Sequence, residues 1–328
     1  MPRNIFCFHI MRANFGSQAM SVIDLAQTAI CPAANVHALF LSFDRKAGAD
    51  ATQTRRAIGQ LAQALDGWIA LDASARSSWV IGVGSEAWDD LADAARPREL
   101  ASFPQFDDAV APLPNTPHAL FLHLRSERED LCFEAGELAR STLADVADLI
   151  DAVPCFRYMG GRDMTGFVDG TENPTPDERP GVALVDDDAP FDGGSYLHVQ
   201  RFVHDLARWQ TLPVPIQERV IGRTKADDEE MDDEQKPPTA HIARVVIEED
   251  GEELSIVRQS LPYGTVGGER GLYFISYCKS PRPFTLMLAR MYTRRDGPSD
   301  HLLQFTRAVT GAAYFVPPRA MLSNWSDA

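Results

Sequence analysis

Short apolar runs alternate with amphipathic stretches along the first half of the chain. The runs predict buried β-strands, and stretches with apolar residues every three or four positions predict helices. The order approximates β-α-β-β-α-β. In sequence, we predict a strand over Val36–Phe43, a helix over Ala51–Leu65, a strand over Trp79–Val83, a short helix over Ala87–Ala94, a strand over His118–Leu124 and a long helix over Glu129–Val153.

The second half repeats this order of elements without repeating the sequence itself. We therefore predict an α+β fold of two halves, joined near Asp151–Gly161, each with an antiparallel sheet covered by helices on one face. Runs rich in Val, Ile and Tyr mark the strands. They cover Ser195–Phe202, His241–Ile247, Leu254–Gln259, Gly271–Tyr277 and Ala312–Val316, with helices over Ile216–Gly222, from Phe284 to Arg290, and around Leu302 and Phe305.

Composition narrows the class of protein. The 328 residues are 45% hydrophobic, which suffices for one large domain or two ordinary ones. No apolar run approaches the roughly 20 residues of a membrane helix. The net charge of −16 disfavours nucleic acid and anionic lipid as partners. Met1–Gly16 shows no secretory signal, and five cysteines without a CxxC pair predict reduced thiols in the cytoplasm.

Three segments carry side chains suited to chemistry, and each also has an ordinary structural interpretation. Gly166–Asn173, GFVDGTEN, sets Asp169 among glycines and equally fits an Asp-Gly turn. His241 begins an apolar run and is either a metal ligand or a hydrogen-bonded histidine. Arg258 interrupts an apolar strand, where a guanidinium needs a partner or a solvated edge. The acidic segment Ala226–Pro238 predicts a solvated loop.

The order of several short motifs resembles the dye-decolourising peroxidase family. Gly166–Pro174 (GFVDGTENP) is similar to the family's G-x-x-D-G signature, and His241 in a T-A-H-I-A-R context and Ile256–Gly264 (IVRQSLPYG) follow in family order. The resemblance covers most of the second half, begins more loosely at about Ser21, and is strongest to the compact bacterial branch called class B or P. Further matching segments are Gly194–Tyr196, Val199–Arg201, Ile221–Lys225, Gly271–Phe274 and Phe305–Gly311.

The resemblance implies two ferredoxin-like halves, with haem b bound mainly by the C-terminal half. It divides the chain into an N-terminal extension (1–20), an N-terminal ferredoxin-like domain (21–155) and a C-terminal ferredoxin-like haem-binding domain (156–328). It implies an enzyme that reduces H2O2 and oxidises organic donors such as dyes and phenolics through a ferryl intermediate. Two alternatives stay open, a protein that stores or delivers haem or releases its iron, and a non-haem binding module. Only catalysis requires Asp169 and Arg258 together.

By the same resemblance, His241 is the axial ligand of the haem iron, and the catalytic side chains Asp169, Arg258 and Ser260 lie on the opposite face. Asp169 is expected to shuttle the proton of the peroxide. Arg258 is expected to stabilise the charge that develops as the O–O bond breaks, and to keep Asp169 ionised in mildly acidic solution. We predict that loss of Arg258 is at least as damaging as loss of Asp169.

Other residues are expected to hold the cofactor. A ligating histidine usually donates its second ring nitrogen's proton to a carboxylate, and we predict Asp300 for that partner, with Asp296 behind it. Arg223, and after it Arg201, is expected to bind the haem propionates. The remaining predicted contacts with haem are Gly170, Thr171, Phe274 and Leu286.

The resemblance also bears on partners. It implies H2O2 and small organic reductants as substrates and a homo-oligomer in the cytoplasm. Some relatives are cargo of encapsulin shells, but here the chain ends at Ser323–Ala328, soon after the last predicted strand, and we expect no such loading. No carboxylates for Mn²⁺ can be placed. Aromatic residues available for passing electrons to large dyes are Tyr196, Tyr263, Tyr273, Tyr277 and Trp209.

Overall fold

The computed structural model describes residues 21–327, so the predicted N-terminal extension over 1–20 lies outside the described residues. The first half of the chain follows the predicted β-α-β-β-α-β order after one short helix. Its elements are α1 (Val22–Leu25), β1 (His37–Arg45), α2 (Ala51–Ile69), the 3-10 turn η1 (Ala73–Ala75), β2 (Ser78–Gly84), α3 (Trp88–Leu91), β3 (Leu120–Ser126), α4 (Glu129–Thr142) and β4 (Ala147–Phe156).

The second half contains the same order of long elements, interrupted by short helices and hairpins. Its first part comprises α5 (Arg179–Ala183), η2 (Ala189–Phe191), β5 (Ser195–His204), α6 (Leu206–Trp209), α7 (Val214–Ile221), α8 (His241–Val245), β6 (Glu248–Glu249) and β7 (Glu252–Glu253). Its second part comprises β8 (Val257–Arg258), β9 (Leu261–Gly264), β10 (Arg270–Cys278), α9 (Arg282–Tyr292), η3 (His301–Gln304), β11 (Thr306–Ala308), β12 (Ala312–Val316) and α10 (Arg319–Ser326).

Strand pairing confirms the antiparallel α+β architecture. Within the described residues, ten strands form one sheet whose main order is β4-β1-β3-β2-β12-β5-β10-β8. Each half thus places its fourth strand beside its first and its third between first and second, which is the ferredoxin-like order predicted for both. The halves join where Tyr314 and Phe315 of β12 pair with Gly84 and Val83 of β2.

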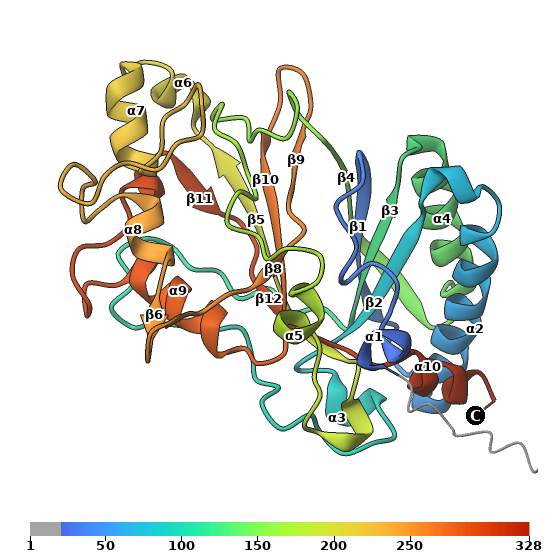
Figure 1. Ribbon diagram of the computed structural model, residues 1–328. Helices are drawn as coiled ribbons and strands as arrows, with labels where there is room; N and C mark the ends of the chain where they lie inside the picture. Colours follow the sequence, from blue (N-terminus) through green and yellow to red (C-terminus); the bar gives the residue numbers. More distant parts are fainter. Residues whose placement is uncertain (1–20, 328) are drawn as a thin grey trace, which may run out of the picture.

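The two parts of this sheet pack face to face, with helices on the outside (Figure 1). Helices α2 and α4 cover the outer face of the first half, and α8 and α9 cover that of the second. Aromatic rings from both halves fill the layer between: the Phe40 ring stacks on Tyr273 with centroids 4.3 Å apart, and Phe121 lies 5.2 Å from Tyr314. This buried layer fixes the position of β10 and β8, which carry part of the cavity described below.

Helix α10 comes from the end of the second half but packs on α2 of the first. Gly59 permits the contact, because a Cβ atom at this position would lie 2.3 Å from the backbone nitrogen of Ser326 and 2.8 Å from the Leu322 carbonyl oxygen. Leu322 and Trp325 are buried in the core beneath α2. The chain therefore returns to its first half after β12.

Three predicted elements were wrong in type or extent. The long helix over Glu129–Val153 ends at Thr142, and β4 follows it as an edge strand whose half-exposed sequence mimics a helix. The strand over His241–Ile247 is instead the helix α8, since Ile242, Val245 and Val246 fit a helical face as well as a strand. Only Val257–Arg258 of the predicted strand Leu254–Gln259 is a strand.

Two expectations from composition can be compared with the described residues. The four cysteines among them (Cys31, Cys132, Cys155 and Cys278) are free and buried, as predicted for reduced thiols. No helix in residues 21–327 has the length and apolar character needed to cross a membrane.

Candidate functional site

A large cavity lies in the second half, between the helices α8 and α9 and the strands β5, β8 and β10. It encloses about 1460 Å³ of space free of protein atoms, its open mouth included. Every lining residue belongs to the range 163–306. The cavity therefore lies in the half for which the sequence predicted a cofactor.

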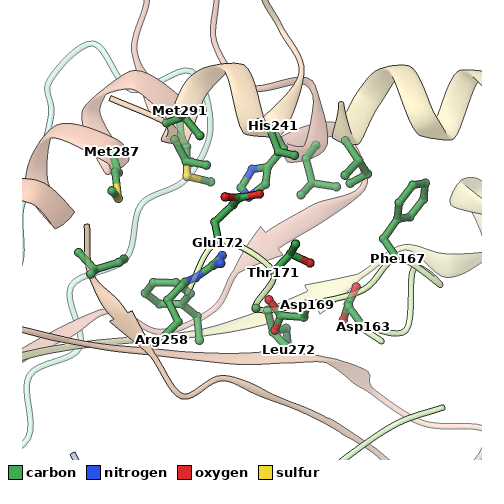
Figure 2. Close-up of a pocket in the computed structure, with 18 of the residues that line it drawn as sticks. Asp163, Phe167, Asp169, Thr171, Glu172, His241, Arg258, Leu272, Met287 and Met291 are labelled. Atoms are coloured by element: carbon green, nitrogen blue, oxygen red, sulfur yellow. The ribbon is translucent and has the colours of Figure 1, made fainter. Parts of the chain in front are cut away.

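His241 enters the cavity from the first turn of α8. Its Nδ1 lies 2.6 Å from Oδ2 of Asp300, whose side chain is fully buried. The other carboxylate oxygen of Asp300 accepts a hydrogen bond from the Leu302 amide at 2.8 Å, so the carboxylate is fixed at both oxygens. With Nδ1 engaged, Nε2 is the ring nitrogen left for a ligand, and Figure 2 shows the ring pointing into the cavity.

Asp169 and Arg258 lie across the cavity from His241 (Figure 2). Asp169 is in the loop after Val168, and its amide donates to the Gly161 carbonyl oxygen at 3.0 Å. Gly170 follows with a φ of +86°, a backbone conformation that favours glycine. Arg258 ends the two-residue strand β8. The structure thus brings together three residues that are 89 positions apart or less in the sequence.

Two opposing effects act on the pKa of Asp169, the charge of Arg258 expected from the sequence and the burial of the carboxyl. Burial raises the pKa of the Asp169 carboxyl above its ordinary value, and the nearby Arg258 guanidinium only partly opposes this. The negative charge of Asp163 adds to the rise. Arg258 thus lowers the pKa of Asp169, in the direction expected from the sequence, but desolvation outweighs this attraction.

A second acid-base pair lines the same cavity and was not predicted. Oδ1 of Asp163 lies 3.0 Å from Nε2 of His204, and Nδ1 of His204 lies 2.8 Å from the Thr306 hydroxyl. Both side chains are largely buried. Burial raises the pKa of Asp163, but the charge and hydrogen bond of His204 together with the hydrogen bonds from Thr165 outweigh burial, so the pKa is lowered. Its sequence context, a lone Asp after Arg, gave no signal of this pairing.

The other predicted residues divide between the cavity wall and its surroundings. Gly170, Thr171, Arg223 and Phe274 line the cavity, whereas Leu286 is absent from its lining. The Arg223 guanidinium already contacts Glu172 at 2.6 Å and Asp228 at 2.8 Å.

Arg201, Ser260 and Asp296 lie outside the cavity lining. Arg201 pairs with Asp151 of the first half at 3.0 Å, and the Ser260 hydroxyl accepts a hydrogen bond from the Ile275 amide at 3.2 Å. The exposed Asp296 pairs with Arg290 at 3.3 Å instead of contacting His241.

The wall between these polar groups is apolar. The cavity therefore joins an imidazole on one side to a carboxylate and a guanidinium on the other, separated by hydrophobic side chains. Such a site suits a flat, largely apolar ligand with a metal at its centre, with acid-base groups on the face away from the imidazole. The apolar residues include Ile242, Val245, Val246, Leu272, Phe274, Phe284, Met287, Leu288, Met291 and Leu302.

Comparison with known proteins assigns both halves to one family. The model described as Dyp-type peroxidase, N-terminal, matches residues 27–156, and the model described as Dyp-type peroxidase, C-terminal, matches residues 160–321. The chain is 44% identical over 253 residues to the dye-decolorizing peroxidase of Rhodococcus erythropolis, covering 76% of this chain and 74% of that one.

Solved structures agree with this similarity. A DypB variant from Rhodococcus jostii RHA1 in complex with heme is 38% identical, with a TM-score of 0.84 over 91% of this chain and 98% of that one. The encapsulated DyP-type peroxidase from Mycobacterium smegmatis is also 38% identical, with a TM-score of 0.87 over 92% of this chain and 98% of that one.

Proposed function

The chain belongs to the Dyp-type peroxidase family of haem peroxidases, and we propose that it holds haem b in the cavity beside His241 and reduces H2O2 there while oxidising organic donors such as dyes and phenolics. One observation supports this most directly. His241, fixed by Asp300, faces Asp169 and Arg258 across an apolar cavity. This arrangement accounts for all three residues at once.

The residues present fit haem on their own chemistry. The Asp300 carboxylate fixes the His241 ring and makes it more basic, as second partners of ligating histidines do, and this leaves Nε2 for the iron. Apolar side chains from α8, α9 and β10 suit the faces of a porphyrin, and Arg223 at the cavity wall suits a propionate. Arg223 would then exchange part of its pairing with Glu172 or Asp228. Arg201 is the second choice, because it is absent from the cavity lining and pairs with Asp151.

Bound haem supplies the iron centre at which peroxide is reduced. Asp169, when ionised, accepts a proton from the incoming peroxide and returns one to the departing oxygen. Arg258 places a fixed positive charge beside the negative charge that develops as the O–O bond breaks. Ser260 lies outside the cavity lining, and its hydroxyl accepts from the Ile275 amide, so it would support the chain two residues after Arg258 against β10.

We propose small organic reductants as electron donors, a homo-oligomeric state and a cytoplasmic location. The five aromatic residues considered for electron transfer to bulky dyes are all buried, with exposed fractions from 0% for Tyr277 to 6% for Tyr263. Any transfer to a large dye therefore needs a relay or an exposed part of the haem.

The test is single-turnover kinetics on haem-reconstituted protein. The ferric enzyme is mixed with one equivalent of H2O2 in a stopped-flow spectrometer, beside the Asp169→Asn, Arg258→Leu and His241→Ala variants. We expect His241→Ala to change the ferric Soret band, and at least one of the other two to slow the reaction by about 100-fold or more. A normal Soret band with a slow reaction that no variant changes would favour haem storage or delivery instead.

A further inference from the structure

The carboxamide of Asn173 bonds the main chain of Arg258 at both of its polar groups. Its Nδ2 donates to the Arg258 carbonyl oxygen at 2.7 Å, and its Oδ1 accepts from the Arg258 amide at 2.8 Å. Asn173 lies four residues after Asp169 in the same loop. One side chain therefore links the loop of the cavity carboxylate to the backbone of the cavity guanidinium.

The position of Arg258 in the sheet explains why this link is needed. Strand β8 has two residues and ends the main strand order. Arg258 lies opposite Ser276 of β10, and the next amide, that of Gln259, donates to the Ile275 carbonyl oxygen. Since backbone groups alternate between the two sides of a strand, those of Arg258 point away from β10. No further strand pairs with that side within the described residues.

A carboxamide carries the same donor and acceptor as a peptide group. Asn173 therefore takes the place of a neighbouring strand at a single residue and satisfies an edge that otherwise depends on water. Its own backbone is held as well, because its amide donates to the Gly170 carbonyl oxygen at 3.1 Å. The turn over residues 170–173 thus transmits the position of Asp169 to Arg258.

We propose that Asn173 is a positioning residue for the peroxide reaction, which holds Asp169 and Arg258 in a fixed mutual orientation. This inference rests on the proposed function of those two residues. Asn173 is absent from the cavity lining, so it acts through Arg258 and does not touch the substrate. Displacement of a reacting group by about 1 Å lowers enzymatic rates by roughly 100-fold.

The decisive variant is Asn173→Leu, which keeps a similar side-chain size and removes both hydrogen bonds. The matched control is Thr175→Ala in the same exposed loop, because the Thr175 amide and hydroxyl bond Glu178 and not Arg258. In haem-reconstituted protein, we expect Asn173→Leu to lower the second-order rate constant for H2O2 by about 10- to 100-fold with an unchanged KM for the donor. Thr175→Ala should change that constant by less than about twofold.

Two further measurements separate positioning from a general loss of structure. Amide hydrogen exchange of the haem-loaded protein should be faster at Arg258 in Asn173→Leu and unchanged in Thr175→Ala. Asn173→Leu is also combined with Arg258→Leu. Expressed as free energy, the loss of rate in this double variant should be much smaller than the sum of the losses in the two single variants, because both substitutions act through Arg258.

Each outcome has a defined meaning. If Asp169→Asn and Arg258→Leu slow the reaction but Asn173→Leu matches Thr175→Ala, the two hydrogen bonds from Asn173 to Arg258 are unimportant for the rate and only this inference fails. Fully additive losses in the double variant would likewise overturn it. If neither Asp169→Asn nor Arg258→Leu slows the reaction, the proposed function fails, while faster exchange at Arg258 in Asn173→Leu would still report the hydrogen bonds themselves.

Discussion

The carboxylate of Asp300 lies 2.6 Å from Nδ1 of His241, and its second oxygen accepts from the Leu302 amide. This pairing sets which ring nitrogen of His241 faces the cavity and how basic that nitrogen is. The two residues are 59 positions apart, and the contact exists only because η3 and α8 are adjacent.

We expect Asp300→Asn to raise the reduction potential of the haem iron and to weaken haem binding by about 10- to 100-fold. A neutral amide places less negative charge beside the imidazole, and its single oxygen cannot accept from both His241 Nδ1 and the Leu302 amide. Spectroelectrochemistry and a haem titration measure the two effects. An unchanged potential would show that Asp300 only caps η3.

The raised pKa of Asp169 predicts the pH dependence of the peroxide step. The proton-accepting form exists only above this pKa, so the rate constant should fall as the pH decreases through a value above the roughly 3.9 of an ordinary aspartate. Arg258→Leu removes the charge that lowers this pKa and should move the acidic limb to higher pH.

Stopped-flow rate constants measured across pH test this shift, with Arg258→Lys as the control that keeps a positive charge. Its limb should stay closer to that of the unchanged protein. A limb at the same pH in the Leu and Lys variants would contradict the electrostatic coupling between residues 169 and 258.

The two arginines considered for the propionates should behave differently. Arg223 lines the cavity, whereas Arg201 contacts Asp151 of the first half. We expect Arg223→Gln to weaken haem binding by about 10-fold, the usual effect of losing one charged hydrogen bond. Arg201→Gln should leave haem binding unchanged. A haem titration followed at the Soret band distinguishes the two variants. Equal losses of haem affinity in both would contradict the assignment of Arg223 to a propionate.

Arg125 is a buried guanidinium between the halves that contacts neutral acceptors. It donates to Gln259 at 2.7 Å, to Asn35 at 3.1 Å and to the Ala33 carbonyl oxygen at 2.7 Å, and burial lowers its pKa to about 10. Arg125→Lys should reduce the free energy of unfolding by about 1–3 kcal/mol, because an ammonium cannot reach all these acceptors.

Urea denaturation measures this loss. The exposed Arg140 on α4, which pairs with Glu137 at 2.7 Å, provides the control, and Arg140→Lys should leave the urea midpoint unchanged. Equal midpoints for the two variants would mean that the fork of Arg125 is not required.

The arrangement of the sheet could be predicted because apolar runs mark its strands independently of tertiary contacts. Val36–Phe43, for example, lies within one residue of β1 at its start. The residues near His241 were misread because Ile242, Val245 and Val246 fit a strand and a helical face equally. The helix predicted through Val153 failed for a similar reason, since Val146 and Ile150 continue a spacing that also suits the edge strand β4.

The sequence predicted the site residues that lie within the matched motifs, but not the contacts between residues that meet only in the folded chain. Gly166–Pro174 pointed to Asp169, but an asparagine before a proline is typical of a turn, so Asn173 gave no sign of its contact with Arg258. Asp163 and His204 meet through the packing of β5 against the loop before Asp169. Asp300 was predicted before Asp296 as the partner of His241, and in the structure Asp300 contacts His241 whereas Asp296 pairs with Arg290.

The return of the chain to its first half has a consequence for the order of folding during synthesis. The first half is translated first, yet β2 gains its second neighbour only from β12, and the surface of α2 at Gly59 is covered only by α10. A ribosome-bound chain that has reached Phe156 therefore still exposes a strand edge and an apolar helix surface. The half that emerges first is completed last.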